Sequence, residues 1–161
     1  MQRFEPTIVA FCCHYCAYTA ADMAGSMRLA YPPNVKILRV PCSGKVDAIH
    51  IMKSLEKGAD GVLVAGCLEG DCHFKNGNVK ALQRVTYLKR FLEEIGIEPE
   101  RVEMVTMSAG MGSRFAKIAA EFTDTMRELG PSPVKASDRM EPCAKASYPK
   151  ISRRTDNNDY S

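Results

Sequence analysis

The hydrophobic pattern of the chain alternates between short apolar runs and longer stretches with helical spacing. Four runs predict strands, at residues 7–12, 35–40, 60–66 and 101–107. Apolar positions three or four apart predict four helices, at residues 17–30, 47–58, 79–95 and 112–129. Strands that alternate with helices form βαβ units with a parallel sheet. We therefore expect an α/β fold: a small four-stranded parallel sheet with flanking helices, flavodoxin-like or Rossmann-like.

The composition changes after residue 130. Prolines, serines and mixed charges replace the apolar periodicity, so residues 131–161 are predicted to form an extended or disordered tail. Residues 1–130 then form one domain. The chain of 161 residues is long enough to bury a core without disulfides.

The bulk composition excludes several classes of protein. Apolar residues make up 45% and charged residues 25%, and the net charge of +3 is far below that of a nucleic-acid binder. The N-terminal apolar stretch is too short for a signal peptide, and no stretch approaches the 18 or so apolar residues of a membrane helix. A cytoplasmic location is therefore expected, with no membrane or nucleic-acid partner.

The cysteine content points to metal or redox chemistry. Seven cysteines are present, an odd number, in a chain without an export signal. Disulfide frameworks belong mainly to small secreted domains, whereas clustered thiols in a reducing compartment are typical of metal ligands and redox groups.

The positions of the cysteines carry more information than their number. Six of them lie at or after the C-terminal ends of the first three predicted strands: Cys12, Cys13, Cys16, Cys42, Cys67 and Cys72. Parallel strands all point the same way, so the loops that follow them meet at one edge, where open α/β folds place ligands. We therefore expect these thiols to be neighbours in space.

The local spacing supports a metal centre at this edge. Cys13 and Cys16 form a C-x-x-C motif, and Cys67 and Cys72 form a C-x₄-C motif in a loop with Gly66 and Gly70. Glycines let backbone N–H groups approach the sulfurs. Soft thiolates with few competing imidazoles favour an iron–sulfur cluster or zinc over harder metals.

Other interpretations of the same residues remain open at this point. The C-x-x-C motif is also that of a thiol–disulfide oxidoreductase, and four thiols could hold a structural zinc ion. Strand alternation turns Cys12 away from Cys13, which is compatible with a buried hydrophobic role. Cys143 lies in the predicted tail and is not expected to be a ligand.

The remaining motifs add little. His14 and His73 are next to cysteines; His73 could ligate as in a Rieske centre, but a hydrogen-bond donor or an exposed side chain is the more common role. Gly110 and Gly112 lack the third glycine of a dinucleotide fingerprint. The residues thus predict a cofactor site without a substrate site.

Two long segments resemble a known family. FCCHYCAYTAADMAGSMRLAYPPNVKILRVPCSG and EKGADGVLVAGCLEGDCHFKNGN resemble the delta subunit of methyl-viologen-reducing hydrogenase, and the likeness extends through EEIGIEPERVEMVTMSA to about residue 130. The most specific motifs are the C-x-x-C, Tyr-Pro-Pro, Cys-Ser-Gly and Gly-Cys-x-x-Gly-Asp-Cys-His. The family often has Asn-Trp inside its C-x-x-C, where this chain has His14 and Tyr15.

The resemblance implies a non-catalytic electron-transfer subunit with a [2Fe–2S] cluster. Such subunits connect an input oxidoreductase, a nickel–iron hydrogenase or formate dehydrogenase, to the flavin-containing A subunit of heterodisulfide reductase, where electron bifurcation occurs. The recurrent cysteines of the family correspond here to Cys13, Cys16, Cys42, Cys67 and Cys72. Because a [2Fe–2S] cluster takes four thiolates, one of the five is spare.

Overall fold

The computed structural model describes residues 4–136 and contains one four-stranded parallel sheet. Its strands are β1 (Ile8–Cys13), β2 (Val35–Val40), β3 (Gly61–Gly66) and β4 (Val102–Thr106). They lie in the order β2-β1-β3-β4, and every neighbouring pair is parallel. The predicted α/β class and four-stranded sheet are confirmed.

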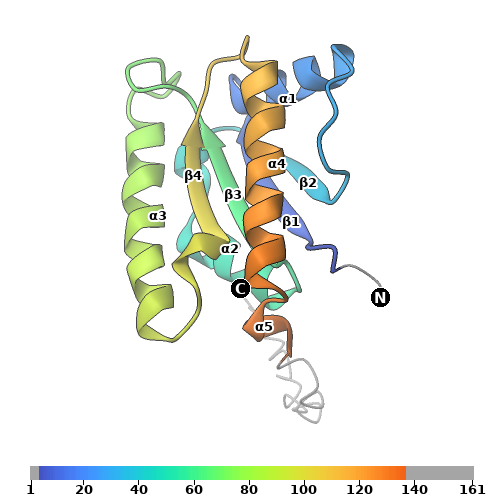
Figure 1. The fold of residues 1–161 in the computed structure, drawn as a ribbon. Coiled ribbons are helices and arrows are strands. Elements are labelled where there is room, and N and C mark those ends of the chain that lie inside the picture. The colour runs from blue at the N-terminus through green and yellow to red at the C-terminus, as the bar shows by residue number, and fades with distance from the viewer. Residues whose placement is uncertain (1–3, 137–161) are drawn as a thin grey trace, which may run out of the picture.

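Helices cover both faces of this sheet, as Figure 1 shows. They are α1 (Ala17–Ser26), α2 (Ala48–Glu56), α3 (Gly77–Glu94), α4 (Gly112–Leu129) and the short α5 (Pro133–Ala136). Two 3₁₀ turns, η1 (Ser43–Lys45) and η2 (Pro99–Arg101), precede α2 and β4. Helix α1 ends at Ser26, earlier than predicted, and Arg28 beyond it has a left-handed φ of 53°, which no helix continues through.

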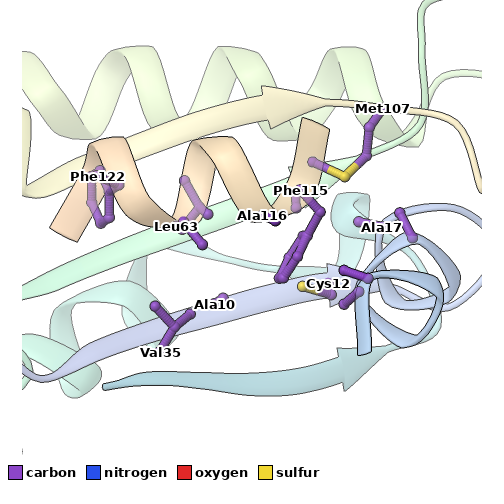
Figure 2. Close-up of a cluster of buried hydrophobic side chains, with 14 of the residues drawn as sticks. Ala10, Cys12, Ala17, Val35, Leu63, Met107, Phe115, Ala116 and Phe122 are labelled. Carbon is purple, nitrogen blue, oxygen red and sulfur yellow. The ribbon is translucent and has the colours of Figure 1, made fainter. Parts of the chain in front are cut away.

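Two hydrophobic cores lie on opposite faces of the sheet. Along β1, Ala10 and Cys12 pack into the core beneath α1 and α4, whereas Phe11 packs into the core beneath α2 and α3. Figure 2 shows Ala10 and Cys12 on the same side of β1, with Phe115 of α4 nearby. This alternation fixes the side to which each residue at the end of β1 points.

Small residues let α1 and α4 pack closely. The buried residues of α1 are all alanines, and a Cβ added at Gly112 of α4 would lie 3.0 Å from the backbone nitrogen of Ala24. The backbones of the two helices therefore come into close contact at Gly112. This contact fixes α1, and with it the C-x-x-C segment directly before it.

A buried arginine closes the opposite end of the sheet. Arg101, at the amino end of β4, is fully buried and donates through Nη1 to the carbonyls of Asp60 (3.0 Å) and Gly130 (3.1 Å). Its Nη2 donates to the carbonyl of Pro131 (3.3 Å), and its Nε to the carboxylate of Glu98 (2.7 Å). That hydrogen bond holds the pKa of Glu98 below its usual range.

The carboxylate of Asp60 completes this network. It accepts the backbone N–H groups of Thr7 (2.8 Å) and Ser132 (3.0 Å) and, like Arg101, is fully buried. The segment after α4 is thus fixed at the amino ends of the strands, where α5 lies (Figure 1). The rest of the predicted tail, residues 137–161, lies outside the described residues. No helix within residues 4–136 has the length and apolar character that crossing a membrane requires.

We predict that Arg101→Leu lowers the free energy of unfolding by roughly 3–5 kcal/mol, because it leaves the carboxylate of Glu98 and the carbonyls of Asp60, Gly130 and Pro131 without their donor. Urea unfolding measures the change, with Arg90→Leu on the exposed face of α3 as the control, expected within about 0.5 kcal/mol of the parent. Equal stability of the two variants would contradict the role given to Arg101.

Candidate metal centre

Six cysteines lie at the carboxyl ends of three neighbouring strands, and the thiols of five of them meet at one edge of the sheet, as predicted for those five. All six are buried and none forms a disulfide: Cys12, Cys13, Cys16, Cys42, Cys67 and Cys72. The seventh, Cys143, lies outside the described residues. Because β1 lies between β2 and β3, the loops after these strands are adjacent.

Three of these thiols form a compact group. The Sγ atoms of Cys13, Cys16 and Cys67 all lie within 4.8 Å of one another. Cys13 and Cys67 are 54 residues apart in the chain, yet their sulfurs are separated by 3.8 Å. Three buried sulfurs at this spacing can all ligate one metal centre, so the group has the geometry of a soft-metal site.

Cys42 and Cys72 form a second pair beside this group. A Cβ added at Gly77 would overlap the Sγ of Cys42 and lie 3.3 Å from the Sγ of Cys72, so both sulfurs contact the first residue of α3. Besides burial, the negative charges of the Cys72 and Cys13 thiolates raise the pKa of Cys42, and the charge of the Cys72 thiolate raises the pKa of Cys67. The pair and the group of three therefore share one electrostatic environment.

Hydrogen bonding places the negative charge of the C-x-x-C motif on Cys13 rather than on Cys16. The thiol of Cys16 donates to Cys13, and this bond, together with the N–H groups of Tyr15 and Ser43, lowers the pKa of Cys13 to about 5. Donation to Cys13 raises the pKa of Cys16, and burial raises it further. Cys13 is therefore the thiolate of the pair, although both side chains are buried.

Backbone N–H groups favour a second thiolate at Cys72. Burial raises its pKa, but the N–H groups of Phe74, Gly77 and Asn78 outweigh burial and hold the pKa below its ordinary value. Cys42 accepts one such bond, from the N–H of Gly44 (3.4 Å), and burial keeps its pKa raised. Burial likewise raises the pKa of Cys67. N–H donors of this kind support sulfur ligands and help to set the potential of a cluster.

Two glycines allow the loops to approach each other behind Cys42. A Cβ added at Gly44 would lie 2.7 Å from the Cα of Gly77, so the backbones of η1 and α3 are in direct contact. Arg84 of α3 fixes this contact by donating to the carbonyls of Gly44 (2.6 Å) and Val46 (3.2 Å). The loop that carries Cys42 is thereby fixed on the loop that carries Cys72.

Asn78 is a positioning residue that the sequence pattern does not reveal. Its buried side-chain amide donates to the carbonyls of Cys67 (3.1 Å) and Leu68 (2.8 Å), while its backbone N–H faces the sulfur of Cys72. One residue therefore fixes both ends of the C-x₄-C loop. Its only sequence signal is its place in the Gly-Asn that begins α3, which is not distinctive.

Cys12 takes no part in the thiol group. Its side chain lies in the core beneath α1 and α4, beside Phe115 in Figure 2, as strand alternation predicts. Burial raises the pKa of its thiol to about 12, so it remains protonated. Five of the six thiols expected at this edge therefore remain as candidate ligands.

Exposed aromatic rings lie over the two cysteine loops. Tyr15 stacks on His73 with the ring centroids 4.0 Å apart, and Phe74 contacts both of these rings edge-on. His14 contacts Tyr15 in the same way. Both histidines are exposed, and neither belongs to the compact group of metal-ligating atoms. The rings bridge the C-x-x-C and C-x₄-C loops.

The donor set fits an iron–sulfur cluster. It consists of thiols alone, it is buried, and backbone N–H groups face three of its sulfurs. One further donor lies close by: the hydroxyl of Ser43 is buried and has no hydrogen-bond partner among residues 4–136. A buried hydroxyl without a partner costs about 1–3 kcal/mol, which a bound acceptor such as a cluster sulfide would offset.

Known proteins resemble this chain over nearly its whole described length. The iron-sulfur D subunit of an F420-non-reducing hydrogenase from Archaeoglobus profundus is 53% identical over 130 residues, covering 81% of this chain and 95% of that protein. The vhu iron-sulfur D subunit of the same kind of hydrogenase from Methanocaldococcus jannaschii is 43% identical, covering 82% and 98%.

A relative of a different kind is much longer than this chain. The A subunit of the ferredoxin:CoB-CoM heterodisulfide reductase of Methanosarcina mazei is 40% identical over 126 residues, which are 78% of this chain and 16% of that protein. The family model for the methyl-viologen-reducing hydrogenase delta subunit matches residues 8–130, which include all five candidate ligands. The chain therefore belongs to the family of methyl-viologen-reducing hydrogenase delta subunits.

Proposed function

We propose that this chain is a non-catalytic electron-transfer subunit that holds one [2Fe–2S] cluster through four of five cysteines: Cys13, Cys16, Cys42, Cys67 and Cys72. The observation that carries the proposal is the convergence of three buried sulfurs within 4.8 Å, with the Cys42 and Cys72 pair beside them. Electron relay through a cluster needs neither an acid–base pair nor a substrate site beside these thiols.

Cys13, Cys16 and Cys67 supply three ligands in this proposal, and Cys72 supplies the fourth. The three N–H groups that face Cys72 stabilise its thiolate, whereas Cys42 has one such donor and a raised pKa. Cys42 is then the spare cysteine.

The surrounding residues bind the cluster and exclude water from it. When bound, a thiolate-held [2Fe–2S] cluster supplies one-electron oxidation and reduction. Asn78 holds the loop that carries Cys67 and Cys72 against α3, and Arg84 holds the neighbouring Cys42 loop, so the sulfurs keep their positions when the charge of the site changes. Tyr15 and His73 cover the loops while leaving ring edges exposed to a docking partner.

The partners we propose are an input oxidoreductase, a nickel–iron hydrogenase or formate dehydrogenase, and the flavin-containing A subunit of heterodisulfide reductase. The hydrogenase-subunit names of the full-length relatives support the first. The similar segment inside the heterodisulfide reductase A subunit of Methanosarcina mazei supports the second. Two domains that are fused in one protein commonly bind each other where they occur as separate chains. An electron-bifurcating complex in the cytoplasm fits both partners.

Thiol–disulfide exchange by Cys13 and Cys16 is the alternative that one observation favours, namely the lowered pKa of Cys13. An exchange nucleophile must be accessible, however, and both cysteines are buried. The convergence of Cys67 on the same two sulfurs also has no purpose in that mechanism. A zinc-stabilised adaptor would use the same ligands, and metal analysis separates it from the cluster.

We predict that protein purified or reconstituted without oxygen contains about two irons and two acid-labile sulfides per chain. Its visible absorption should bleach when dithionite is added. Colourless protein with one zinc per chain would disprove the cluster, and turnover of a disulfide substrate without iron would favour thiol exchange.

Serine variants test the assignment of ligands. Cys13→Ser, Cys16→Ser, Cys67→Ser and Cys72→Ser should each lose most of the iron and the visible absorption, because each removes a thiolate. Cys42→Ser should retain them. Cys12→Ala is the matched control beside Cys13: it should keep full iron content and lose about 1 kcal/mol of stability. Full iron content in Cys72→Ser together with loss of iron in Cys42→Ser would show that Cys42 is the fourth ligand and Cys72 the spare cysteine.

The glycine beside the Cys42 and Cys72 pair supplies an independent test. Gly77→Val should lower iron occupancy, because its side chain would overlap the sulfur of Cys42 and crowd that of Cys72. Gly25→Val on α1, where an added Cβ meets nothing within 4 Å, is the control and should keep its iron. Unchanged iron content in Gly77→Val would contradict the position given to the pair.

A further inference from the structure

A groove with an apolar floor and a basic rim lies on the face of the sheet that carries α2. It has a volume of about 440 Å³ and runs between β1, β2 and α2. The floor consists of Val9 and Phe11 of β1 and Leu38 of β2. Because these residues lie in the body of the strands, the groove is separate from the loops that carry the cysteines.

The β2 side of the floor is exposed because no helix among residues 4–136 covers β2 on this face. In the register of the sheet, Val9 pairs with Lys36 and Phe11 with Leu38, so these four side chains share one face. Helix α2 packs against β3 and α3 rather than over the edge strand. Figure 1 shows β2 at the edge of the sheet farthest from α3. Leu38 is consequently 46% exposed, although parallel sheets are usually covered on both faces.

Every charged or titratable side chain that lines the groove is basic or a histidine. Lys36 projects from β2, His50 and Lys53 lie on α2, and Lys57 comes directly after the helix. No carboxylate occurs among the described residues that line it. The groove therefore presents apolar surface inside a ring of positive charge.

The lysines around the groove disfavour two candidate occupants: a second copy of this chain bound through the same groove, and the chain's own residues 137–161. A second copy of this chain would place lysines against lysines across a two-fold contact. The chain's own residues 137–161 carry five lysines and arginines and four carboxylates, with no acidic run. An acidic partner protein complements the rim, and its apolar residues would cover Leu38 and the exposed part of Val9.

We infer that this groove binds an acidic amphipathic helix of a partner protein, which completes the helical layer that α2 and α3 leave open over β2. Helix-in-groove recognition matches apolar residues to the floor and carboxylates to the rim. The helix anchors the chain in its complex and leaves the cysteine edge free for electron transfer. The inference goes beyond the proposed function, since the contact needs no cluster.

Photocrosslinking in cells that assemble the native complex tests this contact. Leu38→p-benzoylphenylalanine places the probe on the floor, and peptide mapping identifies the attached segment. Leu82→p-benzoylphenylalanine on α3 is the matched control, because Leu82 is 51% exposed and lies outside the groove. We expect the Leu38 variant to attach to one acidic, apolar helix of another protein of the complex, and the Leu82 variant not to attach to that segment.

Charge reversal makes the test specific to the rim. Lys53→Glu combined with Lys57→Glu should lower the crosslinking yield at Leu38 roughly tenfold, whereas Arg90→Glu combined with Lys117→Glu, the same charge change on α3 and α4, should leave it unchanged. Attachment to a second copy, to nucleic acid or to no segment above the control level would overturn the inference. Iron content is measured in every variant: a Leu38 variant with its lysines unchanged that holds the cluster but does not crosslink refutes the groove alone, and crosslinking by that variant without a cluster refutes the proposed function alone.

Discussion

The structure depends on bringing several buried thiols to one place. Each thiolate there raises the free energy that is needed to ionise the next thiol. Parallel strands meet the geometric part of this requirement, because the loops after β1, β2 and β3 open at one edge. Backbone N–H groups meet part of the electrostatic requirement by donating to Cys13, Cys42 and Cys72. A bound metal centre would neutralise the remaining negative charge. The five thiols therefore have the geometry and the hydrogen bonding that suit a metal centre.

The two ends of the sheet perform separate tasks. At the amino ends, Arg101 and Asp60 bind the start of the last segment through a buried polar network. At the carboxyl ends, Gly77 and Asn78 let α3 begin directly against the sulfurs. Stability can therefore be perturbed at one end without touching the thiols at the other.

The α/β class and the convergence of the cysteines could be predicted from the sequence, because apolar periodicity locates the strands and the loops after parallel strands open at one edge. The strand order β2-β1-β3-β4 was not predicted, since periodicity does not specify which strands are neighbours. The orientation of Cys12 also followed from alternation along β1. Asn78 and the buried hydroxyl of Ser43 could not be predicted, since their roles depend on contacts with residues of other loops. The exposure of Leu38 could not be predicted either. It depends on where α2 crosses the sheet, which hydrophobic spacing does not specify.

Mössbauer spectroscopy of the chain purified from cells grown with iron-57 tests the central claim most directly, because it reports the number of iron sites and their ligands together. The account predicts two iron sites in equal amounts, both coordinated by sulfur, coupled to a diamagnetic pair in the oxidised protein. After one-electron reduction, one site should become ferrous and the other remain ferric. A single uncoupled iron, iron with nitrogen or oxygen ligands, or protein that folds with zinc and takes up no iron would contradict it.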